Sequence, residues 1–263
     1  MLKKGRGRVI PMDELAKRLE VTFIDADVKE KDRTSIRKFI STLKKKDIET
    51  YEHSVRIALI GARMARVLGI DPKPMVFAGT LHDIGKTMIP DSVLKKKVAY
   101  GPEDRKVMSK HVEYSHSILK EIHPFSAEVA LYHHFFQKNP YPTTFPRSLL
   151  GKSPKQQARF YALLLSFADH YDAATTRTNS KRGQRLSPAG ARKNLVKEFP
   201  QFRKMIMSLY DRDAFNEAMP FHPMKSILLN PRVVMRIRNK RGKLAVYAKP
   251  KFGLARRKLI QIK

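Results

Sequence analysis

Residues 47–68, DIETYEHSVRIALIGARMARVL, decide the fold class of this chain. Their apolar side chains recur at helical spacing and line one broad face, made of Val55, Ile57, Ala58, Ile60, Met64, Ala65 and Leu68. This periodicity continues from about Thr34 to Tyr210. It predicts an all-α bundle.

Further helices are expected at about 33–46, 73–83, 101–122, 125–138, 154–174 and 187–198. The loops between them are marked by proline or glycine: Asp71-Pro72, Ile89-Pro90, Gly101-Pro102, Asn139-Pro140 and Ser187-Pro188. Residues 1–32 give only a weak, mixed signal. They are therefore set apart as an N-terminal segment.

Length and composition narrow the class of protein. The 263 residues can bury a large core, and 42% hydrophobic with 30% charged residues argue against extended disorder. No apolar run approaches the ~20 residues of a membrane-spanning helix. The basic start is followed by Asp13, Glu14 and Lys17 rather than by an apolar core. We expect a cytoplasmic protein without a transmembrane segment.

Cysteine is absent from the sequence. This excludes disulfides, thiolate nucleophiles and cysteine-ligated metals. Any metal ion must therefore bind to His, Asp and Glu.

Positive charge is concentrated at the carboxyl end. The chain has 54 Lys and Arg against 24 Asp and Glu, a net charge of +30. No acidic residue follows Glu217, whereas 13 Lys and Arg do. We place a domain boundary there and expect 218–263 to form a basic tail.

Within this tail, the alternation of Val233, Met235 and Ile237, and again of Leu244, Val246 and Ala248, predicts a β-hairpin. Its charge favours a polyanionic partner such as nucleic acid. A solvated or subunit-facing surface is the alternative reading, and the sequence indicates no oligomeric state.

The strongest chemical motif is Leu81-His82-Asp83-Ile84-Gly85-Lys86, at the predicted end of an apolar helix. An imidazole and a carboxylate side by side can reach one cation. Gly85 is expected to end the helix. One helix earlier, Glu49 and His53 are four residues apart and share a helical face.

Other candidate ligands follow along the chain. A lone histidine is more often structural than a ligand, so His116, His123, His170 and His222 are left aside. The remaining residues form a set of eight oxygen and nitrogen ligands: Glu49, His53, His82, Asp83, His111, His133, His134 and Asp169.

The order His53, His82-Asp83, Asp169 resembles the HD superfamily of metal-dependent phosphohydrolases. Longer phrases, at 81–96, 101–111 and 169–177, resemble its HD-GYP branch of cyclic di-GMP phosphodiesterases. The resemblance covers roughly 33–210. It implies an HD-type helical bundle, with 33–217 as the catalytic domain.

The resemblance also implies two or three bound Fe or Mn ions. His53, His82, Asp83 and Asp169 would be the core ligands, with Asp83 bridging. His111, His133 and His134 would complete the second metal site, and Glu49 matches the extra carboxylate of a trinuclear subset. Lys86 would contact the scissile phosphate, while Arg177 and Tyr141 would contact other parts of the substrate.

One loop departs from the family pattern. The family has His-His-Glu, two residues, Asp-Gly, one residue and Gly-Tyr-Pro, whereas Phe135-Phe-Gln-Lys-Asn-Pro-Tyr-Pro142 follows His134 here. The Glu, the Asp and both Gly are missing. Pro140 also lacks the N–H and the freedom of glycine. The substrate loop is therefore altered.

A hydroxide held between two cations would attack phosphorus in line, so no protein nucleophile is needed. We therefore expect a metal-dependent phosphodiesterase acting on cyclic di-GMP or a related cyclic dinucleotide. One alternative is an HD phosphohydrolase acting on another nucleotide or RNA. The other is a nucleic-acid-binding or effector protein with a vestigial or structural metal site.

Overall fold

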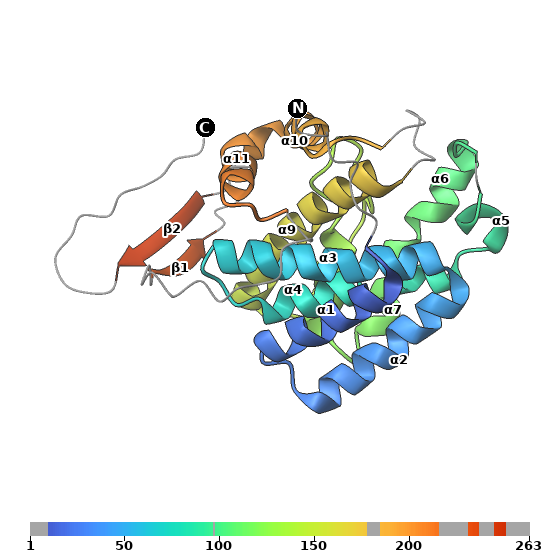
Figure 1. The fold of residues 1–263 in the computed structure, drawn as a ribbon, viewed down its shortest axis with the longest axis horizontal. Coiled ribbons are helices and arrows are strands. Elements are labelled where there is room, and N and C mark those ends of the chain that lie inside the picture. Colours follow the sequence, from blue (N-terminus) through green and yellow to red (C-terminus); the bar gives the residue numbers. More distant parts are fainter. Residues whose placement is uncertain (1–9, 97, 178–184, 216–230, 237–244, 251–263) are drawn as a thin grey trace.

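The computed structural model describes residues 10–96, 98–177 and 185–215, together with the backbone of 231–236 and 245–250 (Figure 1). The mainly helical class is confirmed. None of the helices in these ranges has the length and apolar character of a membrane span. The helices are α1 (Met12–Asp25), α2 (Glu30–Lys46), α3 (Ile48–Val67), α4 (Lys73–Leu81), η1 (Ile84–Met88), α5 (Asp91–Leu94), α6 (Pro102–Ser109), α7 (His111–Leu119), α8 (Pro124–Tyr132), α9 (Lys152–Thr176), α10 (Pro188–Glu198), η2 (Pro200–Phe202) and α11 (Arg203–Asp211).

Helix α3 is the central element. It begins with an N-cap, because the Asp47 carboxylate accepts a hydrogen bond from the Thr50 N–H at 2.9 Å. In Figure 1 it crosses the middle of the molecule, with α1 and α2 on one side and α9 on the other, and it packs against all three. One face, including Ile57, joins a core with α4 and α8–α11, while Val55 joins a second core with α1 and α2. This central position places His53 deep inside the bundle.

Helix α1 was missed by the sequence analysis, which set residues 1–32 apart as a weak signal. Leu15, Leu19 and Phe23 are fully or almost fully buried and belong to the same core as α2 and α3. They repeat every four residues and form a narrow stripe, and polar or charged residues such as Arg18, Glu20 and Thr22 lie beside it in the sequence. The helix is stabilised by packing on α3, a contact that its own composition does not reveal.

Several predicted helices are shorter than expected. The one at 101–122 is interrupted at Lys110, whose N–H bonds to the Val107 carbonyl in a tight turn, and it becomes α6 and α7. The one at 125–138 ends at Tyr132, where the His133 ring contacts the Ala130 carbonyl. The one at 73–83 ends at Leu81, before Gly85, which lies inside η1. Each break falls beside a candidate ligand.

Two short strands belong to the carboxyl-terminal part. β1 (Pro231–Arg236) and β2 (Ala245–Pro250) pair antiparallel, with Pro231 opposite Pro250. Residues 237–244, where the turn of the basic hairpin is predicted, lie outside the described residues, as does the boundary near Glu217. The basic hairpin and its polyanion-binding surface therefore stay predictions.

Candidate metal centre

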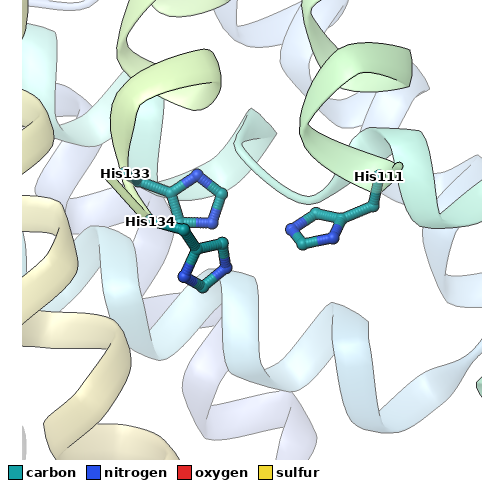
Figure 2. A group of neighbouring side chains, drawn as sticks. All are labelled: His111, His133 and His134. Atoms are coloured by element: carbon teal, nitrogen blue, oxygen red, sulfur yellow. The ribbon is translucent and has the colours of Figure 1, made fainter. Parts of the chain in front are cut away.

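Two groups of side chains able to hold a metal ion lie inside the bundle. His53, Asp83 and His82 form one group and His111, His133 and His134 the other, and within each group the ligand atoms lie within 4.8 Å of one another. Figure 2 shows the second group, in which His133 and His134 from the end of α8 face His111 at the start of α7. Helix ends thus present most of these ligands.

Three of the histidines are oriented by backbone carbonyls. Their Nδ1 atoms lie at hydrogen-bond distance from the carbonyl three residues earlier. The pairs are His82 with Gly79 at 2.9 Å, His111 with Met108 at 2.7 Å and His133 with Ala130 at 2.6 Å. A carbonyl only accepts, so each Nδ1 carries the proton and each neutral ring offers the Nε2 lone pair.

These Nε2 atoms point into the centre of the site. Among the described residues, the buried Nε2 atoms of His53, His82, His111 and His133 have no hydrogen-bond partner. A buried polar atom without a partner costs about 1–3 kcal/mol. A cation bound by these nitrogens removes that cost, and a set of imidazoles and carboxylates suits a divalent transition metal.

Asp83 stands between the two groups. Its Oδ2 lies 3.4 Å from His82 Nε2 and 3.7 Å from His53 Nε2, whereas its Oδ1 lies 3.3 Å from His111 Nε2. Lys86 Nζ donates to Oδ2 at 2.6 Å. Burial opposes ionisation, but the charges of His82 and Lys86 hold the pKa of Asp83 well below its usual range. Asp83 is thus an ionised carboxylate with one oxygen toward each group.

Asp169, on α9, completes the first group. Its Oδ1 lies 3.1 Å from His53 Nε2, and its Oδ2 lies 3.9 Å from His134 Nδ1. Burial raises the pKa of Asp169, but the nearby His53 ring and the charges of His134 and His170 together outweigh burial, and the pKa falls well below its usual range. When His53 carries its proton on Nδ1, its Nε2 and Asp169 Oδ1 are both hydrogen-bond acceptors and face each other. A cation between these two atoms would relieve their repulsion.

Asp172 was missed by the sequence analysis, although it orients a ligand. It is fully buried, its Oδ2 accepts from His53 Nδ1 at 2.7 Å, and Arg56 Nε donates to its Oδ1 at 2.6 Å. Burial raises the pKa of Asp172, yet these partners bring it down to about 2. The sequence signal that could have indicated Asp172 is that Arg56 follows His53, and Asp172 follows Asp169, by three residues, so each pair shares one helical face.

The altered loop lies against the second group. Gln137 Oε1 lies 3.3 Å from His134 Nδ1, and Gln137 Nε2 donates to the Asn139 carbonyl at 2.9 Å. The ring of Tyr141 lies 4.4 Å from that of His134, between centroids. Burial and the nearby charges of Asp169 and Asp83 raise the pKa of the Tyr141 hydroxyl well above its usual value. This predicted substrate residue is therefore adjacent to the candidate metal centre.

Two predicted site residues lie at the edge. Glu49 is exposed, one turn before His53, and belongs to neither group. Arg177, the C-cap of α9, is also exposed, and its charge lowers the pKa of Tyr141 against the effect of burial. Their roles as third-metal ligand and substrate contact stay predictions.

Burial sets the protonation of the second group. It lowers the pKa of His111 to about 4 and that of His133 to about 3. Both rings are neutral near pH 7, the form in which imidazole binds a metal. His82 differs: burial lowers its pKa, but its interaction with Asp83 and the charge of Asp169 together raise the pKa above its ordinary value.

Comparison with known proteins agrees with this geometry. Residues 50–174 match the HD domain family. A cyclic di-GMP phosphodiesterase of Thermotoga maritima is 30% identical over 151 residues, 55% of this chain and 39% of that protein. A 3'3'-cGAMP-specific phosphodiesterase of Vibrio cholerae is 28% identical over 162 residues, 59% of this chain and 30% of that protein. A cyclic di-GMP phosphodiesterase of Pseudomonas aeruginosa is 30% identical over 154 residues, 56% of this chain and 35% of that protein.

The HD-domain match and these relatives support the HD-domain phosphohydrolase superfamily for this chain. Within it, the matches support the HD-GYP-like branch, in agreement with the resemblance seen in the sequence. The chain spans between 30% and 39% of the length of these three curated relatives.

Proposed function

We propose that this chain is a metal-dependent phosphodiesterase that hydrolyses a cyclic dinucleotide. The observation that carries the proposal is the set of four buried Nε2 atoms that lack a partner around the ionised Asp83. The names of the relatives, which are phosphodiesterases of cyclic di-GMP and 3'3'-cGAMP, support the substrate class. The proposal includes the cytoplasmic location expected from the sequence.

The two groups divide the ligands between two cations. His53, His82 and Asp169 would hold one, His111, His133 and His134 the other, and Asp83 would serve both. We infer Fe or Mn, with a third ion if Glu49 also binds. When bound, such ions activate a water for in-line attack on phosphorus and neutralise charge on the phosphoryl oxygens.

Lys86 would bind the phosphate group. Its Nζ already lies 2.6 Å from Asp83 Oδ2, and only 8% of the residue is exposed. Cations on Asp83 would weaken this ion pair, which frees the ammonium for a phosphoryl oxygen beside it. In so buried a position the interaction with a phosphate is strong, because little water screens it. Arg177 and Tyr141 would hold the rest of the substrate.

The altered loop bears on which dinucleotide fits. In this chain Tyr141 lies beside His134 and follows a rigid Pro140. We therefore expect slower cleavage of cyclic di-GMP than in a relative with the full motif, with the product stopping at the linear dinucleotide, or a preference for another cyclic dinucleotide. Chromatography of reactions with cyclic di-GMP and 3'3'-cGAMP measures both. Rapid, exclusive conversion of cyclic di-GMP to GMP would show that the loop change is neutral.

The test of the proposed function uses the full chain loaded separately with Mn²⁺ and Fe²⁺. The substrates are the two cyclic dinucleotides and bis(p-nitrophenyl) phosphate, and Glu113→Ala on the exposed face of α7 is the matched control. Turnover of the generic diester but of neither cyclic dinucleotide would favour a phosphohydrolase that acts on another nucleotide or on RNA. Retained metal without any turnover would favour an effector with a structural metal site.

A further inference from the structure

The five histidines differ in what holds their Nδ1 atoms. His82, His111 and His133 use a backbone carbonyl three residues earlier in the chain. His53 and His134 depend on side chains instead, which are Asp172 and Gln137 respectively. One side-chain partner therefore belongs to each of the two groups.

The partner of His53 is a fixed anion. Asp172 is fully buried on α9, and Arg56 of α3 grips it through Nε to Oδ1 at 2.6 Å and Nη2 to Oδ2 at 3.1 Å. A carboxylate that accepts from the far nitrogen of an imidazole fixes its tautomer and makes it a stronger metal ligand. His53 is thus both oriented and polarised.

The partner of His134 is a neutral amide. Gln137 is partly exposed, lies in the loop after α8 and contacts Nδ1 at a longer 3.3 Å. Its own amide donates to the Asn139 carbonyl, which directs Oε1 toward the ring. This contact sets the tautomer of His134 but supplies no charge.

We propose that the two metal positions are unequal, and that the position of His53 fills first and holds its ion more tightly. Asp172 and Gln137 are the positioning residues that set this difference. The Lys86 ammonium lies beside Asp83 Oδ2, and its positive charge opposes metal binding at the position of His53. The Asp169 carboxylate, 3.1 Å from His53 Nε2, offsets that positive charge. The inference rests on the proposed metal centre.

The experiment is a calorimetric titration of the metal-free full chain with Mn²⁺, followed by electron paramagnetic resonance. The wild type should bind in separate steps, with a mononuclear signal at one equivalent and a spin-coupled signal at two. Asp172→Asn keeps an acceptor for His53 but removes the charge, and should weaken the tight step by about 10- to 100-fold. Gln137→Glu adds the missing charge and should strengthen the weaker step.

Gln157→Glu is the matched control, because it adds the same charge at an exposed position of α9 and should leave both steps unchanged. Thermal unfolding of the metal-free protein shows whether Asp172→Asn still folds. If it does not fold, the effect of Gln137→Glu on the weaker binding step tests the inference alone. Equal affinity at both positions, or a weaker step insensitive to Gln137→Glu, overturns the inference. Absence of Mn²⁺ binding in the wild type would instead contradict the proposed function.

Discussion

Asp83 is the residue on which the whole site depends, because its two oxygens face different groups. Asp83→Ala removes the carboxylate that lies 3.4 Å from His82 Nε2 in one group and 3.3 Å from His111 Nε2 in the other. We expect loss of both ions and of activity to background, measured by elemental analysis and by turnover. Glu113→Ala, on the exposed side of α7, should keep both. Full occupancy and turnover in Asp83→Ala would contradict the assignment.

Glu49 tests the number of ions. It lies one helical turn before His53 but belongs to neither group, so it can serve only an additional ion. If the wild type holds three, Glu49→Ala should lose one and keep part of the activity, because His82, Asp83 and Asp169 remain. Metal analysis of both proteins measures this. A wild type with two ions would rule out the third site.

The buried histidines predict how acid affects the metal-free protein. Unfolded histidine titrates near pH ~6.5, whereas burial lowers the pKa of His111 to about 4 and of His133 to about 3 in the fold. Between these values the unfolded chain binds more protons, so stability is complete above pH ~6.5 and falls as the pH drops toward 4.

Denaturant titrations of the metal-free protein at a series of pH values measure this fall. His133→Gln should show a shallower dependence, since its side chain does not titrate. His82 acts in the opposite direction, because its pKa is raised. A metal-free protein that grew more stable from pH 6.5 to 4 would contradict the prediction.

At the scale of elements, the contact between η1 and α7 joins the two groups. The Gly85 N–H donates to Ser115 Oγ at 2.8 Å, and that hydroxyl donates to the His82 carbonyl at 2.6 Å. A Cβ at Gly85 would clash with the backbone of His111 and Ser115. Backbone cannot yield as a flexible side chain does, so only glycine lets Asp83 come this close to His111.

Gly85→Ala should therefore destabilise the chain by about 1–3 kcal/mol, the usual cost of overpacking, and reduce its metal content. Denaturant unfolding and elemental analysis measure the two effects. Gly151→Ala is the control, because the nearest atom to its added Cβ, Pro154 Cδ, is at 3.9 Å. Unchanged stability and metal content in Gly85→Ala would show that η1 can move away from α7 without weakening the fold or the metal centre.

At the scale of the whole molecule, the net charge of +30 is unevenly distributed, with 13 basic and no acidic residues after Glu217. If this tail binds a phosphate backbone, affinity should fall steeply with salt, by a log–log slope of about 0.9 for each phosphate neutralised on duplex DNA. Truncation after Glu217 should lose most nucleic-acid affinity and keep hydrolysis of a generic diester. Equal affinity with and without the tail, at several salt concentrations, would exclude it as the binding element.

The sequence by itself determined the helical class and the candidate ligands. Helical periodicity and the phrases around His82-Asp83 and Asp169 depend on residues a few positions apart, which is the range over which a backbone repeats. The structure accordingly contains helices within the predicted ranges, although several end early or are divided. It brings seven of the eight candidate ligands into the two groups or beside them.

Only the tertiary structure decided how those ligands are arranged. It showed that α1 joins the core, that helix breaks fall beside His111 and His133, and that Asp83 lies between two groups. The hydrogen bond from His53 to Asp172 spans 119 residues of sequence. Such a contact depends on how α3 and α9 pack, because packing joins residues that no local spacing relates.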